Sequence, residues 1–354
     1  MNIYNNKILE GDIKMINKKR LASLVLAGAL SVSMLTGCSQ GGDSGNSKQE
    51  SASKNKEVKK IGITQLVEHP ALDATKAGFV KALEKNGFKD GENIDIDFQN
   101  AQNDMPTTQS IASKFASDKK DLIFAISTPS AQAAFNATKD IPILMTAVSD
   151  PVAAGLVKTL EKPGGNVSGT SDFVSVDKGL ELLKIFAPKA KTIGVMYNTS
   201  EVNSKVQVDA LKEYASKNGF KVVEKGVTTS NEVNQGISSL VGKIDVLYVP
   251  TDNLVASSMP IVSKIATENK IPVIAAESGP VEKGALACQG INYEKLGYKT
   301  GEMAVKILNG ESVSDMPVAT LDDTDIIVNE DILKALGMEK PSNDNISYVK
   351  TKQE

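Results

Sequence analysis

Short apolar runs alternate with longer amphipathic stretches along the chain beyond Val58. The runs are rich in β-branched residues and predict strands, whereas the stretches have helical periodicity, and this order is typical of βαβ units on a parallel sheet. Residues 60–64 predict the first strand, and residues 71–86 predict a helix that ends at Gly87. Further strands are predicted at 94–98, 121–126 and 141–145, and further helices at 107–117 and 130–138.

The second half of this pattern repeats the first half. Residues 59–63 read KKIGI and residues 191–195 read KTIGV, while KNGFK occurs at both 85–89 and 217–221, so both pairs have the same spacing. The apolar runs that begin at Asp121 and Ile141 recur at Asp245 and Ile271, with nearly that spacing again. Repeats at nearly one spacing predict a duplicated architecture. The expected fold class is α/β, with two similar doubly wound parallel-sheet lobes.

Charge and composition exclude several classes of protein. Lys and Arg total 40 against 43 Asp and Glu, so the formal charge of −3 gives no field for holding nucleic acid. Two cysteines and one histidine are too few for a disulfide framework or a His-based metal site. We therefore expect no nucleic acid, no metal and no cofactor. Arg20 is the only arginine, so no guanidinium is available downstream to bind a carboxylate or a phosphate.

The N-terminal segment has the layout of an export signal. Residues 18–20 are basic and precede an uncharged, mostly apolar segment at 21–37. This segment is too short and too rich in Ala, Ser and Gly to predict a membrane span. We interpret residues 1–37 as a signal peptide and place its start at Met15.

The signal is followed by a candidate lipidation site. LTGC at 35–38 resembles the bacterial lipobox, in which the cysteine, here Cys38, is lipidated and becomes the new N-terminus. An ordinary signal peptide with an incidental cysteine is the alternative. Residues 38–57 are rich in Gly, Ser and other polar residues and predict a flexible tether. Lipid and tether together predict a globular body held at the extracytoplasmic face of the cell membrane.

Polar residues follow the predicted strands of both lobes. In open parallel sheets, ligands bind outside the carboxyl ends of the strands, and two such edges that face each other form a cleft. The strand ends therefore contain the candidate ligand-binding residues, which are Gln65, His69, Thr128, Ser130, Ser149, Tyr197, Asn198, Asp252, Asn253 and Glu277. No catalytic residue is assigned.

Motifs along residues 58–337 carry a family resemblance. They are VEHPALDA at 67–74, STPSAQAA at 127–134, VSDPVAAGLV at 148–157, GTSD at 169–172, YNTSEVNS at 197–204, PTDNLVAS at 250–257 and GINYEKLGYKTGEMA at 290–304. Together with the signal and lipobox, they resemble the substrate-binding lipoproteins of bacterial ABC importers, and within these the group that binds tryptophan or related aromatic amino acids. The resemblance implies a monomer that captures a small amino acid and delivers it to the transmembrane subunits of an ABC permease.

The resemblance also implies a type I binding-protein fold, in which the chain crosses between the lobes three times and the lobes close about this hinge. We expect crossings near 168–172, 281–286 and 310–317, with a strand and a helix returning to the first lobe within 287–308. The expected N-terminal lobe is 58–170 plus 284–312, the expected C-terminal lobe is 171–283 plus 313–340, and residues 341–354 form a tail.

An α-amino acid would need partners for its carboxylate and its ammonium group, because both lose water on binding. Without a downstream arginine, hydroxyls at a helix N-terminus are expected to bind the carboxylate. We assign this role to Thr128 and Ser130, supported by Ser149. The acceptors assigned to the ammonium group on the opposing lobe are Asp252, Asn253 and Glu277. Three rings are candidates for stacking on the ligand side chain, namely those of Phe173, Tyr197 and His69.

Alternatives exist for several residues and for the function. His69 before Pro70 is equally consistent with capping or packing the first helix, and Asp252 with capping the helix that follows it. Tyr293 is expected in the hinge or core rather than at the ligand. A sugar or nucleoside ligand, a sensor or adhesion role, and catalysis are the other functional readings. Catalysis is disfavoured because no GxSxG, P-loop, Rossmann glycine run or HExxH is present.

Overall fold

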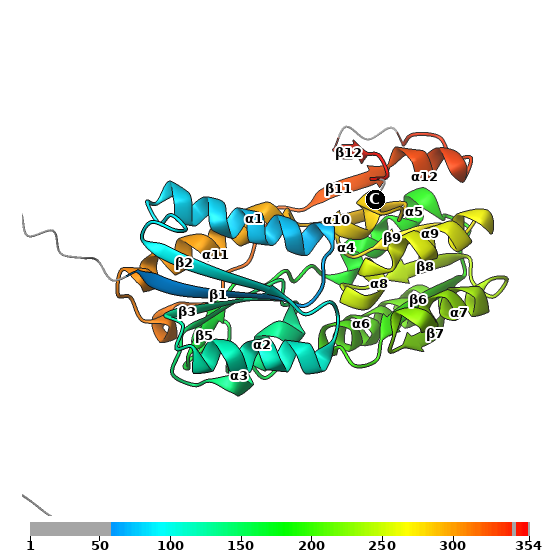
Figure 1. Ribbon diagram of the computed structural model, residues 1–354. Coiled ribbons are helices and arrows are strands. Elements are labelled where there is room, and N and C mark those ends of the chain that lie inside the picture. Colours follow the sequence, from blue (N-terminus) through cyan, green and yellow to red (C-terminus); the bar gives the residue numbers. More distant parts are fainter. Residues whose placement is uncertain (1–57, 342–344, 353–354) are drawn as a thin grey trace, which may run out of the picture. The chain divides into compact units, whose positions relative to one another are not determined.

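The computed structural model describes residues 58–341 and 345–352 (Figure 1). The predicted signal peptide, Cys38 and the whole predicted tether lie outside these residues. Two sheets organise the described part of the chain, one of five strands and one of seven. Within it, no helix combines the length and the apolar character needed to cross a membrane.

The first lobe is built on a parallel sheet with the strand order β2-β1-β3-β4-β5. Its strands are β1 (Lys59–Gln65), β2 (Ile94–Asn100), β3 (Leu122–Ile126), β4 (Ile143–Thr146) and β5 (Val167–Gly169), and its first helices are α1 (Pro70–Lys85), α2 (Met105–Ser117) and α3 (Thr128–Ala137). Every residue of β3 and β4 is buried, because helices cover both faces of the sheet. The Phe79 and Phe124 rings stack with centroids 3.8 Å apart, joining α1 to the sheet.

The second lobe repeats this order and extends it. Its sheet runs β12-β11-β10-β9-β8-β6-β7, so that β7-β6-β8-β9-β10 correspond to the five strands of the first lobe. The strands are β6 (Thr192–Asn198), β7 (Lys221–Val227), β8 (Val246–Val249), β9 (Val273–Ala275), β10 (Ala287–Gly290), β11 (Asp325–Asn329) and β12 (Ile346–Val349). The helices are α4 (Val176–Glu181), α5 (Leu183–Phe186), α6 (Val202–Asn218), α7 (Ser230–Leu240), α8 (Asn253–Ser257), α9 (Met259–Glu268), α10 (Ser278–Glu282) and α12 (Glu330–Ala335). The strand β11 is antiparallel to β10, so this sheet is mixed, unlike the first.

The chain passes between the lobes three times, as expected, but two crossings lie elsewhere than predicted. The first crossing lies between β5 and α4, close to the predicted 168–172. The second lies between β10 and α11 (Tyr293–Leu308), because β10 pairs with β9 and β11 and therefore belongs to the second lobe. The prediction that a strand within 287–308 returns to the first lobe is therefore wrong, and only the helix returns. The third crossing follows Ala319, which still pairs with Thr170.

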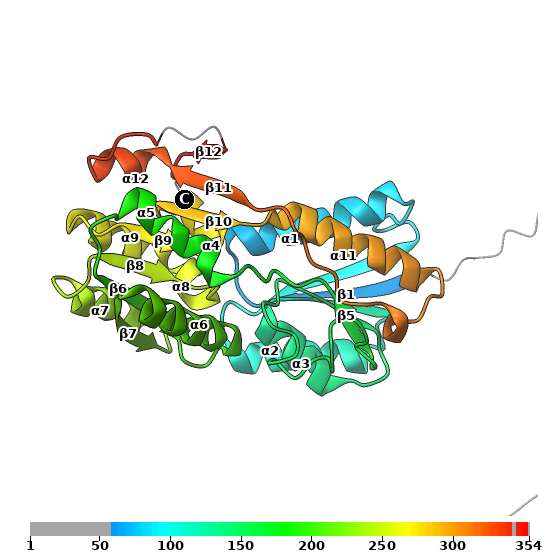
Figure 2. The same cartoon turned by 180° about the vertical axis from the view of Figure 1, so that it is seen from behind.

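The first two crossings exchange equivalent helices. The helix α4 follows β5 of the first lobe but packs on α6, β9 and β10 of the second. Conversely, α11 follows β10 of the second lobe but packs on α1 and β4 of the first, as both views show (Figure 1 and Figure 2). Each lobe thus contains a helix whose preceding strand belongs to the other lobe. In the second lobe this helix is α4, which follows β5, and in the first lobe it is α11, which follows β10.

Glycines allow the returning helix α11 to approach α1 closely. A Cβ atom on Gly297 would lie 1.9 Å from the carbonyl oxygen of Thr75, and one on Gly78 would lie 2.0 Å from that of Glu294. Both distances are shorter than any real Cβ contact, so the two backbones touch at these positions. The close packing joins segments that are distant in the sequence, since Lys81 of α1 pairs with Glu294 of α11 at 2.7 Å.

We predict that Gly297→Ala lowers the free energy of unfolding by about 2 kcal/mol or more, because the added methyl group forces α11 away from α1. Urea denaturation followed by circular dichroism measures this change. Gly165→Ala is the matched control, since a Cβ there meets nothing within 4 Å. Equal stability of the two variants would contradict the proposed helix contact.

Candidate functional site

The carboxyl ends of the strands in both lobes carry many of the buried polar residues of the described chain. Nine of the ten predicted site residues are buried, namely Gln65, His69, Thr128, Ser130, Ser149, Asn198, Asp252, Asn253 and Glu277. Because polar side chains are seldom buried without a reason, this concentration marks the strand ends as the candidate site.

Several buried polar atoms at these strand ends have no hydrogen-bond partner among the described residues. They are Gln65 Oε1, both ring nitrogens of His69, Thr128 Oγ1, Asp172 Oδ1 and Asn203 Oδ1. Each such atom costs about 1–3 kcal/mol when it is shielded from water. They come from both lobes and from the first crossing.

The N-terminus of α3 has the properties of an anion site. Ser127, which precedes the helix, is buried with φ of 91°, a strained value for a residue other than glycine. The strain turns the chain sharply from β3 into α3, whose first backbone N–H groups have no partners within the helix. Thr128 and Ser130 add two buried hydroxyls, of which Thr128 Oγ1 is unpartnered in the described structure. These donors suit a carboxylate, as predicted for the two residues.

Two carboxylates and a phenol form a second polar cluster at the crossings. Tyr293, the first residue of α11, donates its hydroxyl to Asp172 Oδ2 at 2.8 Å, and both side chains are buried. Glu277, at the end of β9, lies beside the same hydroxyl and is 2% exposed. None of the ion pairs formed among the described residues includes Asp172 or Glu277. No cationic side chain of the described residues therefore compensates these two acids.

Burial dominates the titration of this cluster. It raises the pKa of Glu277 to about 8, assisted by the charge of Asp172 and opposed by the hydrogen bond to Tyr293. Burial also raises the pKa of Asp172, although hydrogen bonds from Tyr293 and Ser149 counteract it. Both shifts mean that the ionised carboxylates are poorly solvated where they lie, so a cation brought to them would be stabilised.

The remaining acidic residues of the second lobe's strand ends are satisfied by the protein itself. The Asp252 carboxylate accepts hydrogen bonds from Asn198 N at 2.6 Å, Ser204 Oγ at 2.6 Å and Val255 N at 2.8 Å. It is the N-cap of α8, which was the alternative to ligand binding considered from the sequence. Burial and the nearby Glu201 raise its pKa to about 7. Asp252 thus holds three segments of this lobe together rather than presenting free acceptors.

Glu201 likewise accepts hydrogen bonds within this lobe, and two of its donors are the predicted site residues Asn198 and Asn253. Its carboxylate accepts hydrogen bonds from Asn198 Nδ2 at 3.1 Å and from Asn253 Nδ2 at 2.5 Å. Asn203 Nδ2 also donates to it at 3.1 Å, while Asn203 Oδ1 stays unpartnered among the described residues. Glu201 and Asn203 were not among the predicted site residues, although they lie in the YNTSEVNS segment.

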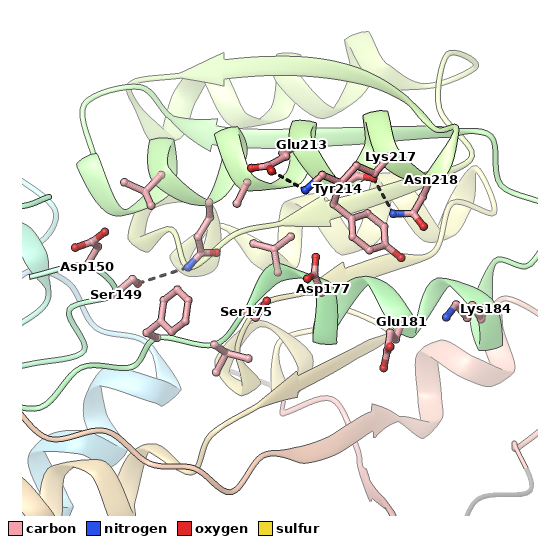
Figure 3. A pocket seen from close by; sticks show the side chains of 16 residues that line it. Ser149, Asp150, Ser175, Asp177, Glu181, Lys184, Glu213, Tyr214, Lys217 and Asn218 are labelled. Carbon is pink, nitrogen blue, oxygen red and sulfur yellow. Dashed lines mark hydrogen bonds and ion pairs between the residues drawn. The ribbon is translucent and has the colours of Figure 1, made fainter. Parts of the chain in front are cut away.

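The first lobe and α6 are linked through Ser149. Gln207 Nε2 lies 3.5 Å from Ser149 Oγ and 2.9 Å from Thr251 Oγ1. A pocket of about 490 Å³ opens beside this contact, with Ser149 and Asp150 at one end and the last turn of α6 at the other (Figure 3). Ser149 is therefore a contact between the lobes as well as a neighbour of Asp172.

Two of the three predicted stacking rings, those of Phe173 and Tyr197, are not fully buried like the third, that of His69. Phe173 lines the pocket of Figure 3 and is 57% exposed. Tyr197 packs against the core of the second lobe, and its hydroxyl lies 3.3 Å from Glu224 Oε2 on the neighbouring strand. Tyr197 packs in the same cluster as Val208 and Leu211 of α6, so it faces the α6 side of the sheet.

His69 lies against the second lobe. A Cβ on Gly279 of α10 would be 3.4 Å from His69 Nδ1 and 3.2 Å from Ala71 N, so glycine allows the start of α1 to meet α10. The ring is 4% exposed. Burial lowers the pKa of His69 to about 4, although Asn253 and Asp73 counteract it, so the ring is neutral at pH 7. The His69 side chain does not cap α1, the other role considered from the sequence.

Asp172 and Tyr293 are the functional candidates that strand ends did not reveal, because both lie on crossings. A signal existed for each, since GTSD and GINYEKLGYKTGEMA carried part of the family resemblance.

Residues 60–352 match the family described as ABC transporter substrate binding protein. The chain is an ABC transporter substrate-binding protein. It is therefore a binding protein and not an enzyme, and the predicted family and two-lobe fold are confirmed.

Curated and solved relatives agree with this assignment. The binding protein is 71% identical over 337 residues to the tyrosine-binding protein of Clostridioides difficile strain R20291, a match that covers 95% of this chain and 98% of the relative. It is 38% identical to the ABC domain from Streptococcus pneumonia solved in complex with L-Trp, with a TM-score of 0.78 over 81% of this chain and 97% of the other.

A third relative has almost the same sequence but a different conformation. The ligand-free, open structure of a substrate-binding protein with adhesive properties from Clostridium difficile is 98% identical and covers 83% of this chain and 100% of the other. Its TM-score is only 0.65, below that of the 38% identical complex with L-Trp. If sequence divergence determined the TM-scores, the 98% identical relative would have the higher one. The binding protein described above therefore differs from the open relative in conformation.

We predict that Asp252→Ala lowers the free energy of unfolding by about 3 kcal/mol, because it leaves three buried donors without their acceptor. Urea denaturation of the ligand-free binding protein measures the loss. The exposed Asp209 pairs only with surface lysines, so Asp209→Ala should change stability by no more than about 0.5 kcal/mol. If Asp252→Ala lowered the free energy of unfolding no more than Asp209→Ala does, the Asp252 carboxylate would again be a candidate acceptor for the ligand.

Proposed function

We propose that this binding protein captures an aromatic L-α-amino acid between its lobes and delivers it to an ABC permease. The observation that carries the proposal is the pairing of two complementary sites. A cluster of buried carboxylates at Asp172 and Glu277 lies at the crossings, and a helix N-terminus with buried hydroxyls lies at Thr128 and Ser130. The first suits an ammonium group and the second a carboxylate, the two groups that every α-amino acid carries.

The order of strands supports a common ligand for the two sites. In the first lobe, β3 leads to Thr128, β4 leads to Ser149, and β5 leads to Asp172. Neighbouring strands are about 4.8 Å apart, so the ends of β3 and β5 lie about 10 Å apart at the same edge of the sheet. This supports one cleft that holds both sites. The aromatic class is supported by the relatives named for tyrosine binding and solved with L-Trp.

Closure about the crossings would complete the site. In an open cleft the carboxylates are solvated, whereas closing removes their water and raises the cost of their charge. A bound ammonium group offsets this cost. The ligand therefore binds the closed state more tightly than the open state and shifts the lobes toward closure. The large difference from the ligand-free, open relative is consistent with two such states.

Isothermal titration calorimetry against the twenty amino acids, sugars and nucleosides tests the proposal. An aromatic amino acid should bind, and at about 100 times its Kd it should stabilise the protein by about 2.7 kcal/mol in a thermal shift. Analogues that lack either the amino group or the carboxylate should not bind measurably. Binding of sugars or nucleosides alone would overturn the assignment.

Within this titration, we predict that Glu277→Gln weakens binding of the amino acid at least about 30-fold, equal to about 2 kcal/mol, because it removes a buried partner of the ammonium group. Far-UV circular dichroism should be unchanged. Glu92→Gln is the control, because Glu92 is exposed and its ion pair with Lys89 lies on the surface. Equal affinities of the two variants would remove Glu277 from the ammonium site.

We further propose that the binding protein is anchored by lipid at the extracytoplasmic face of the membrane. The support is the LTGC sequence at 35–38, preceded by an export signal and followed by a polar tether. A diacylated cysteine supplies two chains, enough for stable anchoring.

Cys38→Ser should release the mature protein from the membrane fraction, because its only lipid-bearing side chain is lost. Cell fractionation followed by immunoblotting measures this release. Cys288→Ser keeps the lipobox and serves as the control, since Cys288 is buried in the second lobe. Retention of the Cys38→Ser protein on membranes would contradict lipid anchoring.

A further inference from the structure

The two buried acids at the crossings come together where the lobes meet. Asp172 lies on the first crossing, Glu277 follows β9 of the second lobe, and Tyr293 begins α11, which packs on the first lobe. Glu277 immediately precedes α10, the helix that meets the start of α1 at Gly279. The same meeting of α10 and α1 therefore brings Glu277 beside Tyr293 and Asp172.

One phenol hydroxyl cannot satisfy two ionised acids. The Tyr293 hydroxyl has a single hydrogen, which it donates to Asp172 Oδ2 at 2.8 Å. Its oxygen can accept a further hydrogen bond, and a protonated Glu277 carboxyl group has the hydrogen to donate. Asp172 Oδ1 is buried without a hydrogen-bond partner among the described residues. While the lobes are together, the cluster therefore needs a cation or a proton.

We propose that Asp172 and Glu277 form an electrostatic gate, which keeps the empty lobes apart at neutral to alkaline pH and permits closure when an ammonium group or a proton enters the cluster. The inference rests on the ammonium site of the proposed function and adds the proton as a second species that permits closure. Both acids are ionised and solvated in an open cleft, and closing removes their water at a cost. A proton removes this cost as an ammonium group does, so the ligand-free protein closes as the pH falls.

The direction of this pH dependence follows from the burial of the acids in the closed state. Burial raises the pKa of Glu277 to about 8 and also raises that of Asp172. Solvated carboxyl groups have pKa values of about 4. Between these values the closed state holds a proton that the open state lacks, so lowering the pH favours closure. One such proton changes the closing equilibrium by up to about tenfold per pH unit.

Other acidic groups around the gate do not change their charge when the lobes close. Asp252 and Glu201 act on Glu277 from the second lobe, and their own hydrogen-bond donors belong to that lobe, so closure leaves their surroundings unchanged. Tyr293 and Cys288 of β10 stay neutral, because burial raises the pKa of both.

His69 opposes the gate at lower pH. Its ring packs against Gly279 of α10 where the lobes meet, and burial lowers its pKa to about 4. An open cleft returns this pKa to about 6.5, so a proton on His69 favours the open state below that pH. The gate acts by itself between about pH 6.5 and pH 8.5, where His69 is neutral in both states.

The test is small-angle X-ray scattering of the full mature protein without ligand, from about pH 8.5 down to about pH 6.5. Saturating L-tyrosine or L-tryptophan provides the closed reference. The radius of gyration should approach this reference as the pH falls, and the ratio of closed to open protein should rise by up to about tenfold per pH unit.

Two variants remove the charge of the gate without changing its shape. Ligand-free Glu277→Gln should be compact over the whole pH range, because its amide carries no charge to bury. Asp172→Asn should be more compact than the wild type at the alkaline end of the range. Glu92→Gln is the matched control and should behave as the wild type, because Glu92 is exposed on the surface.

A wild-type radius of gyration that does not change with pH would overturn the inference. Variants of Asp172 and Glu277 that stay as open as the wild type, with folding verified by circular dichroism, would overturn it as well. Failure of both amino acids to bind would instead reject the proposed function, while the pH response of the ligand-free protein would remain measurable by itself.

Discussion

The removal of water from two carboxylates is the physical constraint around which this binding protein is arranged. Asp172 and Glu277 come from different parts of the chain, share the hydroxyl of Tyr293, and form no ion pair within the described structure. Buried acids without a cation destabilise a protein by several kcal/mol. Both acids lie where the two lobes meet, beside the crossings, so closure of the lobes as proposed would control their access to water.

Two other buried acids of the second lobe differ from Asp172 and Glu277, because the protein itself supplies their hydrogen-bond donors. Asp252 and Glu201 each accept at least three hydrogen bonds from neighbouring amides and hydroxyls. These acids hold the loops after β6 and β8 in a fixed arrangement. Rigid support of this kind keeps the recognition groups in place before the ligand arrives, which reduces the entropy that binding must overcome.

Most of the fold was predictable because its signals are local or repeated. Hydrophobic periodicity located α1, β2 and β3 to within a few residues, and the constant spacing of the repeated motifs revealed the two lobes. The lobe of β10 was predicted wrongly, because its sequence ACQG carries no mark of the sheet that it joins. The duplication indicates the correct lobe of β10, since β10 occupies in the second sheet the place that β5 occupies in the first.

The candidate site was predictable in outline but not in its roles. Strand ends indicated where polar residues would be buried, and Thr128 and Glu277 are both buried there. Sequence alone could not separate Asp252 from Glu277, because an N-cap and a ligand acceptor have the same signature in one chain. Tyr293 lies in the core at the second crossing, as expected from the sequence. Asp172 was missed because crossings have no periodicity, and its meeting with Tyr293 depends on a contact between two distant segments of the chain.

The exchange of α4 and α11 has a consequence for biosynthesis. The first lobe includes residues from β1 to the segment around Ala319, so it stays incomplete until most of the polypeptide has been made. Neither lobe corresponds to a continuous segment that can finish folding by itself while synthesis proceeds. Contacts between distant segments form slowly, because long loops must close first. A chain built in this way remains unfolded for longer after leaving the ribosome, the state in which a secretion channel accepts its cargo.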